Sequence, residues 1–293
     1  MLTLEKLRSL LAVANHGTIA GAAVEVGYTP SAVSQQLSTL ERELGISLVE
    51  RSNRGVSLTP AGRQLCVRAP AILDLVQIAT VEATEAGQGT APITLRIGAF
   101  PTAISALVVP AMALLEPLVR LKIVHLEPEQ ALTELAARRL DAAVVDFYDA
   151  LPEQSPAGLH HVNLLTDPLR IAVRVDRAAS LDLEDLAGIP WVLANPESRF
   201  GRGSRIALEA VGLRPTVLAE IGDHWLTFDV MRTLNVATVL PGMALRGAPE
   251  HVLPVQHIHL DYDRHVHFVT REVLRPHPGF RMLEGALREI AER

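Results

Sequence analysis

Cysteine and aromatic residues are both scarce in this chain. Its single cysteine, Cys66, has no second cysteine with which to form an intramolecular disulfide, so we expect a small residue of a helix rather than a redox sensor. Aromatic residues make up 4% of the chain although hydrophobic residues make up 48%, with many alanines. This composition is typical of a helix-rich globular protein, and 293 residues suffice for two or three domains.

Charge is absent from residues 97–115, the one stretch long enough to be weighed as a membrane span. It contains Gly98, Pro101 and Pro110 and follows a strand pattern, so a buried strand running into a buried helix is the better interpretation. Residues 1–6 show no basic segment followed by an apolar stretch, so no secretory signal is expected. We therefore expect a cytoplasmic protein without a membrane partner.

The strongest pattern lies in residues 18–62, where two short helical segments meet across Gly27 and Tyr28. Thr18 is expected to cap the first helix and Thr29 the second, with Pro30 at the first helical position. Alanines and a glycine leave the first helix with little side-chain bulk, so the second can cross it closely. This arrangement predicts a helix-turn-helix.

The second helix is expected to have two different faces. Val33, Leu37 and Leu40 recur at spacings of four and three and form a buried stripe. Short hydroxyls and an amide lie outside that stripe, and an amide can pair with an adenine edge in the major groove. The residues expected to face DNA on this helix are Ser31, Ser34, Gln35 and Ser38.

These residues are part of a longer match: Ala32-Val33-Ser34-Gln35-Gln36-Leu37, Leu40-Glu41, Leu44-Gly45, Leu48, Arg51, Arg54 and Leu58-Thr59-x-x-Gly62. Over about 45 positions the segment resembles the LysR-type transcriptional regulators. The resemblance implies a winged helix-turn-helix over residues 1–58, with the helix from Pro30 as the recognition helix. It also implies a β wing over residues 48–58, whose Arg51 and Arg54 reach phosphates or a minor groove.

The net charge of the N-terminal segment does not indicate DNA binding, because the first 62 residues hold five basic and five acidic side chains. Affinity for double-stranded promoter DNA would come from positioned groups. The amides at the starts of the helices capped by Thr18 and Thr29 favour phosphate, and the wing arginines add to them. Repeating the site in an oligomer would strengthen weak single contacts.

After the wing, residues 59–89 predict a long helix with a heptad-like apolar seam that needs a partner. Its members are Ala61, Leu65, Ala69, Ile72, Val76, Ala79, Ala83 and Ala86, of which Leu65, Ala69, Ile72, Val76 and Ala79 are the candidate dimer contacts. In the LysR-type family this linker helix pairs between two subunits. The resemblance therefore implies a homodimer or a dimer of dimers. Pro70 is expected to kink the helix.

Alternating strand and helix patterns from residue 92 onward predict an α/β domain with parallel sheets. We expect two lobes, one of residues 92–163 and 264–293 and the other of residues 164–263. Val109-Pro110, Pro117-x-Val119-x-Leu121 and Leu140-Asp141-x-Ala143 resemble the effector-binding domain of the same family, which is like periplasmic solute-binding proteins.

In such a fold a ligand binds between the lobes, at strand ends and helix starts. Thr102 and either Arg199 or Arg202 could hold an anionic group, whereas nearby acidic residues would repel one, so an anionic effector is only weakly favoured. For each residue taken singly a cap or an exposed charge is the commoner role. The candidate effector contacts are Phe100, Thr102, Glu127, Phe147, Asn195, Arg199, Arg202 and His224.

Neither a metal nor a cofactor is expected. Two pairs, His257-x-His259 and His265-x-His267, would each share a strand face, but they lack cysteine and orienting carboxylates beyond Asp261 and Asp263. No Gly-x-Ser-x-Gly and no phosphate-binding glycine loop occurs, so we do not expect an enzyme. The leading hypothesis is an effector-switched regulator, with RNA polymerase a further candidate partner. The alternative is an effector-independent nucleoid or replication-control protein.

Overall fold

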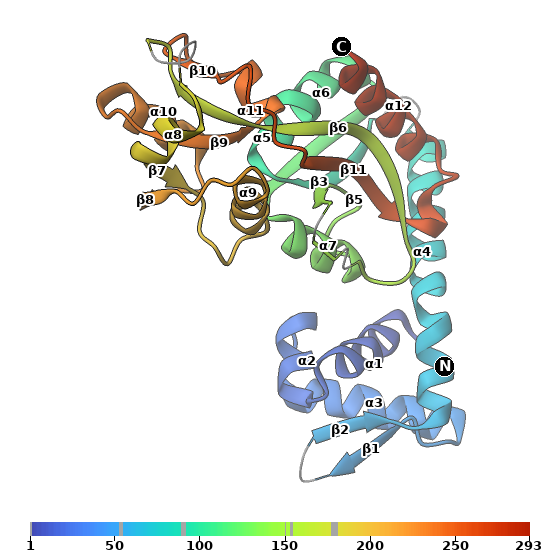
Figure 1. The fold of residues 1–293 in the computed structure, drawn as a ribbon. Coiled ribbons are helices and arrows are strands. Elements are labelled where there is room, and N and C mark those ends of the chain that lie inside the picture. The colour runs from blue at the N-terminus through green and yellow to red at the C-terminus, as the bar shows by residue number, and fades with distance from the viewer. Residues whose placement is uncertain (1, 53–54, 89–91, 150, 153–154, 177–180) are drawn as a thin grey trace. The chain divides into compact units, whose positions relative to one another are not determined.

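The computed structural model describes residues 2–52, 55–88, 92–149, 151–152, 155–176 and 181–293. Contacts divide the chain into two units, Met1–Gly89 and Thr90–Arg293 (Figure 1). No helix in the described ranges combines the length and the apolar content needed to cross a bilayer.

The first unit is a small helical domain with a two-stranded hairpin. A core of leucine, valine and alanine side chains, including Leu10, Val33, Leu37, Leu40 and Leu48, holds it together. Its elements are α1 (Leu4–His16), α2 (Ile19–Val26), α3 (Pro30–Leu44), β1 (Val49–Ser52), β2 (Gly55–Leu58) and α4 (Pro60–Gln88). The sequence pattern predicts α2, α3 and α4, and the family resemblance implies the wing that β1 and β2 form. Neither predicts α1, whose buried Leu7 and Leu10 pack against the neighbouring helices.

Both expected helix caps are present. The Thr18 hydroxyl accepts a hydrogen bond from the Gly21 amide at 3.1 Å, and the Thr29 hydroxyl accepts one from the Ala32 amide at 3.2 Å. Between the two helices Gly27 has φ +71, a left-handed conformation that costs glycine little. The turn of the helix-turn-helix is therefore set by local chemistry.

The residues that follow the recognition helix close the hairpin onto it. One carboxylate oxygen of Glu41 accepts hydrogen bonds from the amides of Leu48, at 2.8 Å, and Val49, at 3.1 Å. The Thr59 hydroxyl donates to the Ser47 carbonyl at 2.8 Å. A Cβ at position 62 would lie 2.0 Å from the Leu48 carbonyl oxygen, so only glycine lets α4 start this close to β1.

The second unit is built on one mixed sheet, in the order β4-β3-β5-β11-β6-β9-β7-β8, with β10 also paired to β6. The strands are β3 (Ile93–Ala99), β4 (Val119–His125), β5 (Ala142–Tyr148), β6 (Leu159–Arg174), β7 (Pro190–Leu193), β8 (Thr216–Glu220), β9 (Ala237–Pro241), β10 (Val252–Pro254) and β11 (Asp263–Arg271). β3, β4 and β5 run parallel in one lobe, and β7, β8 and β9 run parallel in the other. β6 and β11 are antiparallel to their neighbours, so the sheet is not purely parallel.

Helices cover both lobes. The first lobe carries α5 (Pro101–Ala103), the π-helical turn η1 (Ile104–Val108), α6 (Val109–Leu115), α7 (Pro128–Ala136), η2 (Glu272–Leu274) and α12 (Pro278–Glu292). The second carries α8 (Leu183–Gly188), α9 (Arg199–Ala210), α10 (His224–Thr233) and α11 (Gly242–Arg246). In the first lobe α6 and α12 lie on one face of the sheet and α7 on the other (Figure 1).

Four details differ from the sequence pattern. Strand β6 begins at Leu159 and passes through both lobes, whereas the apolar run alone predicts a start at Leu169, because polar residues interrupt the alternation before it. The sequence pattern predicts one helix over residues 102–116 that is interrupted at Pro110, whereas the structure places the irregular turn at η1, which ends at Val108, and Pro110 in the first turn of α6. The segment with His257 and His259 lies after β10 and is not a strand. The pattern also does not reveal β10 and α11.

Candidate functional site

The recognition helix presents the expected polar face. Ser31, Gln35 and Ser38 are exposed, while Val33, Leu37 and Leu40 are buried. The neighbouring Gln36 turns inward and accepts a hydrogen bond from Ser9. Two adjacent glutamines on α3 therefore have different roles: Gln35 is available to a partner, and the partly buried Gln36 bonds to Ser9 within the domain.

The wing is connected to this helix through one side chain. The Arg51 guanidinium on β1 donates a hydrogen bond to the Ser34 hydroxyl at 3.0 Å. This contact places a positive charge beside the polar face of α3. Arg54, the other wing arginine, lies outside the described residues.

Some apolar residues of the long helix α4 pack against α1, and others are exposed. Ala69 and Leu73 are buried and pack with Leu7 of α1, and Leu65 and Ile72 lie at the edge of this cluster. Farther along, the Leu75 side chain is 63% exposed and Val76 is 38% exposed, and Ala79 is also exposed. Ala69 thus packs within its own chain and is not free for a partner subunit. The exposed part of the seam starts at Ile72. It includes Leu75, which is not a member of the heptad-like seam expected from the sequence.

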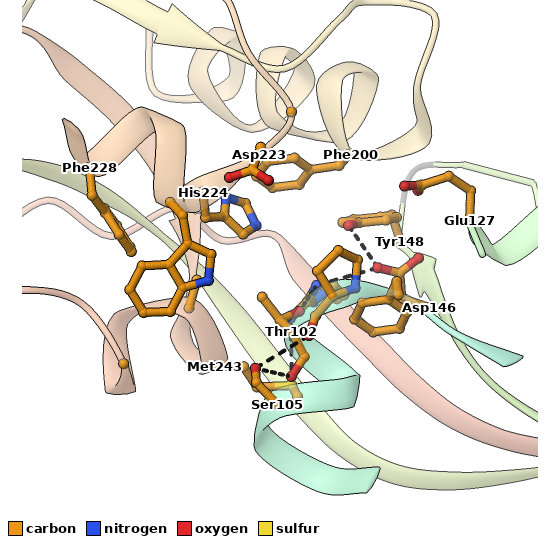
Figure 2. Close-up of a pocket in the computed structure, with 17 residues that line it drawn as sticks. Thr102, Ser105, Glu127, Asp146, Tyr148, Phe200, Asp223, His224, Phe228 and Met243 are labelled. Carbon is orange, nitrogen blue, oxygen red and sulfur yellow. Dashed lines mark hydrogen bonds and ion pairs between the residues drawn. The ribbon is translucent and has the colours of Figure 1, made fainter. Parts of the chain in front are cut away.

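A cavity of about 130 Å³ lies between the two lobes of the second unit (Figure 2). Both lobes line it, and strand β11 contributes Arg264. The lining residues are Phe100, Pro101, Thr102, Ser105, Glu127, Asp146, Tyr148, Phe200, Gly222, Asp223, His224, Trp225, Phe228, Met243, Ala244, Gly247 and Arg264. Of the expected contacts, Phe100, Thr102, Glu127 and His224 lie here.

Arg264 is a buried residue of the cavity lining. Its side chain is 3% exposed and donates to Asp167, with Nε to Oδ2 at 3.1 Å and a second bond from Nη2 to the same oxygen. It also donates to the Thr102 hydroxyl at 3.3 Å and lies 3.4 Å from Asp146 Oδ2. The Phe100 ring covers the guanidinium at 5.0 Å. The positive charge of Arg264 is therefore already paired within the protein.

Asp167 connects this network to the second lobe. Its carboxylate is 1% exposed, and its other oxygen accepts a hydrogen bond from the Met243 amide at the start of α11 at 3.0 Å. A Cβ at Gly242 would lie 2.7 Å from that oxygen, so a glycine is needed for the approach. Thr102 on one lobe and Met243 on the other are thus joined through a single buried ion pair.

The remaining titratable groups make the cavity wall acidic. Burial, reinforced by Arg264, lowers the pKa of His224 to about 4, so this ring is neutral at physiological pH. Burial raises the pKa of Asp146 despite Arg264, and burial and then Asp146 raise the pKa of Glu127. Asp223 caps α10 by accepting from the Leu226 amide at 2.9 Å.

Aromatic side chains gather at this cavity although they are scarce in the chain. Five of the eleven Phe, Tyr and Trp residues line it. The Phe200 and His224 rings meet edge to face at 5.4 Å, and the Trp225 and Phe228 rings do so at 5.7 Å. Trp225 is 65% exposed, an unusual position for the largest apolar side chain.

Four of the expected effector contacts lie outside the lining. Phe147 points to the opposite face of β5 from Asp146 and Tyr148, because side chains alternate along a strand. The side chain of Asn195 accepts a hydrogen bond from the Glu197 amide at 2.8 Å and shapes a turn. Arg199 lies over the Phe147 ring at 5.6 Å and 3.5 Å from Glu129, and Arg202 is exposed on α9.

Sequence reasoning did not select Arg264 and Asp167, which are both buried. The available signal for Arg264 was its place in the alternation of β11, where it shares the inward-facing side with Val266 and Phe268. Among the histidines weighed as metal ligands, His257 Nε2 donates to the Leu181 carbonyl at 2.7 Å, and His265 contacts Asp149. Within the described ranges no three His, Cys, Asp or Glu side chains converge as a metal-ligand set.

Known proteins match both units. The model of the bacterial regulatory helix-turn-helix protein, lysR family, matches residues 4–63, and the LysR substrate binding domain matches residues 88–291. A probable hydrogen peroxide-inducible genes activator of Mycobacterium xenopi is 36% identical over 177 residues, covering 58% of this chain and 89% of that protein. The small neutral protease regulatory protein of Streptomyces coelicolor is 30% identical over 236 residues, covering 77% of this chain and 73% of that protein.

Solved structures share the fold. ArgP from Mycobacterium tuberculosis aligns with a TM-score of 0.65 at 20% identity, covering 99% of this chain and 98% of that one. LysG from Corynebacterium glutamicum, with bound effector Arg, aligns at 0.61 and 19% identity, covering 99% and 98%. Full-length CbnR complexed with its target DNA aligns at 0.57 and 19% identity, covering 99% and 100%.

A helix-turn-helix unit followed by a two-lobed substrate-binding domain defines a class of bacterial regulators. This chain belongs to the LysR family and is a LysR-type transcriptional regulator.

Proposed function

We propose that α3 and the wing of this regulator bind a promoter operator, and that a small molecule in the interlobe cavity changes that binding. The observation that carries the proposal is the cavity itself, whose lining comes from both lobes and whose buried Arg264 and Asp167 join them. A ligand that contacts both lobes stabilises their closed arrangement more than an open one, which shifts the population between the two. The role needs neither a catalytic step nor a cofactor.

On the DNA side, we assign base contacts to Gln35 and Ser31 and a backbone contact to Arg51. The first two are exposed on one face of α3, and Arg51 is held beside that face by Ser34. Ser38 lies on the same face, and the amides at the starts of α2 and α3, capped by Thr18 and Thr29, suit phosphates. CbnR, a structural neighbour, was solved with its target DNA.

For assembly, we assign the open apolar stripe of α4 to a second copy of this chain. Ile72, Leu75, Val76 and Ala79 lie at helical spacings along one side and are at least partly exposed. A homodimer formed through this stripe would place two recognition helices on one operator, which offsets the small number of basic groups on each.

The relatives named as hydrogen peroxide-inducible activators raise the question of a thiol sensor. Cys66 is the single cysteine of the sequence and lies half-buried on α4. Burial raises the pKa of its thiol to about 11, whereas peroxide reacts with thiolate. We therefore assign the signal to the cavity and not to Cys66.

The test begins with genome-wide mapping of the DNA that the full chain binds in its host. Operator affinity is then measured by fluorescence anisotropy while metabolites of the regulated genes are added. The proposal expects sequence-specific binding whose affinity or footprint changes with one metabolite, and loss of that response in Trp225→Ala. Binding that spreads evenly over the genome and ignores every metabolite would contradict it and favour a nucleoid role.

A further inference from the structure

The cavity lining holds more carboxyl groups than basic groups among the residues that the structure describes. Glu127, Asp146 and Asp223 surround the same space (Figure 2). The two basic side chains of the lining are both unavailable to an anion: Arg264 is paired with Asp167, and His224 is neutral. A carboxylate or phosphate ligand would therefore meet repulsion without a counter-charge.

Glu127 is the acidic group best placed to meet a ligand. It lies at the start of α7, and no hydrogen bond or ion pair to its carboxylate is found among the described side chains around it. Glu127 is exposed to solvent, and partial burial and then Asp146 raise its pKa, so a cation placed beside it would stabilise the charged form that these surroundings disfavour. Asp146, by contrast, already accepts from the Tyr148 hydroxyl at 3.1 Å.

The aromatic side chains define the rest of the ligand. Phe200, Trp225 and Phe228 form an apolar wall on the second lobe, and the exposed Trp225 indole gains most from being covered. Ring faces also attract ammonium groups. An acidic end and an aromatic wall together suit a small molecule with an ammonium head and a compact apolar body.

We propose that the effector of this regulator is an apolar or aromatic amine, whose ammonium group binds Glu127 and Asp146 and whose body lies against Trp225 and Phe200. The inference rests on the proposed effector role of the cavity. It reverses the weak preference for an anionic effector that helix starts and arginines favour in the sequence, because Arg199 and Arg202 lie outside the cavity.

The test compares head groups on one skeleton. Isothermal titration of the full chain with phenethylamine, phenethyl alcohol and hydrocinnamate measures affinity for an ammonium, a hydroxyl and a carboxylate, and the same series on a cyclohexyl skeleton repeats the comparison. We expect the amine to bind at least about tenfold more tightly than the alcohol, the size of one charge-assisted bond. Tighter binding of either carboxylate, or no binding of either amine at millimolar concentration, would overturn the proposal.

Paired variants connect the result to the residues. Glu127→Gln should remove the advantage of the amine over the alcohol and leave alcohol affinity unchanged, whereas Glu250→Gln, an exposed carboxylate away from the cavity, should change neither. An unchanged preference in Glu127→Gln would overturn the assignment of the ammonium.

Trp225→Ala should weaken the amine and the alcohol alike, and Leu226→Ala, the exposed neighbour outside the lining, should weaken neither. Equal loss in both variants would overturn the assignment of the apolar body. An amine that binds as expected but leaves operator binding unchanged would count against the proposed regulation and not against the ligand class.

Discussion

The two units of this protein place their candidate functional groups by opposite means. In the first unit Ser31, Gln35 and Arg51 come from one helix and the adjoining hairpin. In the second unit the cavity lining joins Thr102 to Arg264, which are 162 residues apart. A surface built from neighbouring residues tolerates change at one position, whereas a buried network spread over the chain depends on every member. The predictions below test this difference.

The largest effect is expected at the stripe of α4 through which we propose that two copies pair. Leu75→Glu together with Val76→Glu should convert the protein to a monomer in light scattering, because each buried apolar side chain contributes about 1.5–3 kcal/mol and each subunit supplies two. Arg63→Glu, at an exposed position that the helical period places on the opposite side of α4 from this stripe, is the control and should leave the mass unchanged. A double variant with the parent mass would remove this stripe from the interface.

The second effect concerns the buried network. Arg264→Met should lower the free energy of unfolding of the second unit by about 3–5 kcal/mol, because it leaves Asp167 charged and unpaired. Both tryptophans, Trp191 and Trp225, lie in this unit, so urea unfolding followed by tryptophan fluorescence reports on it alone.

Two further variants test whether the loss of stability comes from the broken ion pair. Adding Asp167→Leu to Arg264→Met should recover part of the loss, since Asp167 is then no longer an unpaired charge, and the loss that remains includes the contact of Arg264 with Asp146. Arg202→Met, at an exposed position on α9, should cost almost nothing. If all three proteins unfold at the parent's urea concentration, the network does not support the fold as described.

A smaller effect is expected on the DNA-binding face. Gln35→Ala should reduce discrimination between the operator and a single-base variant by about 1–3 kcal/mol, with nonspecific affinity nearly unchanged. The matched control is Gln36→Ala, whose side chain accepts from Ser9 in the core, so it should lower stability without altering the ratio of affinities. The ratio of dissociation constants for the two operators is the measurement. An unaltered ratio in Gln35→Ala would contradict the assignment.

The smallest effect is expected at Cys66. Cys66→Ala should leave operator binding, before and after peroxide treatment, indistinguishable from the parent protein, because the raised pKa keeps the thiol protonated at neutral pH. Anisotropy with the mapped operator measures this, and slow labelling of the parent by a thiol reagent provides the control. A peroxide response that disappears in the variant would make Cys66 a sensor.

Local signals predict the first unit well. The caps at Thr18 and Thr29, the turn at Gly27 and the stripe of Val33, Leu37 and Leu40 each depend on residues within a few positions, and the structure confirms them. The sequence also indicates the surroundings of Phe100, Thr102 and His224, because ends of strands and starts of helices lie at the cleft in this kind of fold.

The positions of the expected contacts that lie outside the cavity lining have physical reasons. Phe147 is excluded from the cavity by strand alternation, which the neighbouring Asp146 and Tyr148 could have revealed. Arg199 stands at a helix start, a position that suits an anion, but its guanidinium instead lies over Phe147 and beside Glu129. The contacts that a side chain makes depend on which residues, distant in the sequence, the fold brings near it.

The sequence by itself determined the family, the helix-turn-helix and the alternation of strands and helices, because capping, helical period and turn chemistry are properties of short segments. Only the tertiary structure decided that α1 covers Ala69 and that Arg264 is neutralised by Asp167, 97 residues away. Because Asp167 pairs with Arg264, the guanidinium is not free to attract an anionic ligand into the cavity. The electrostatic effect of a buried charge depends on the group with which it pairs, and the folded sheet brings that group to it.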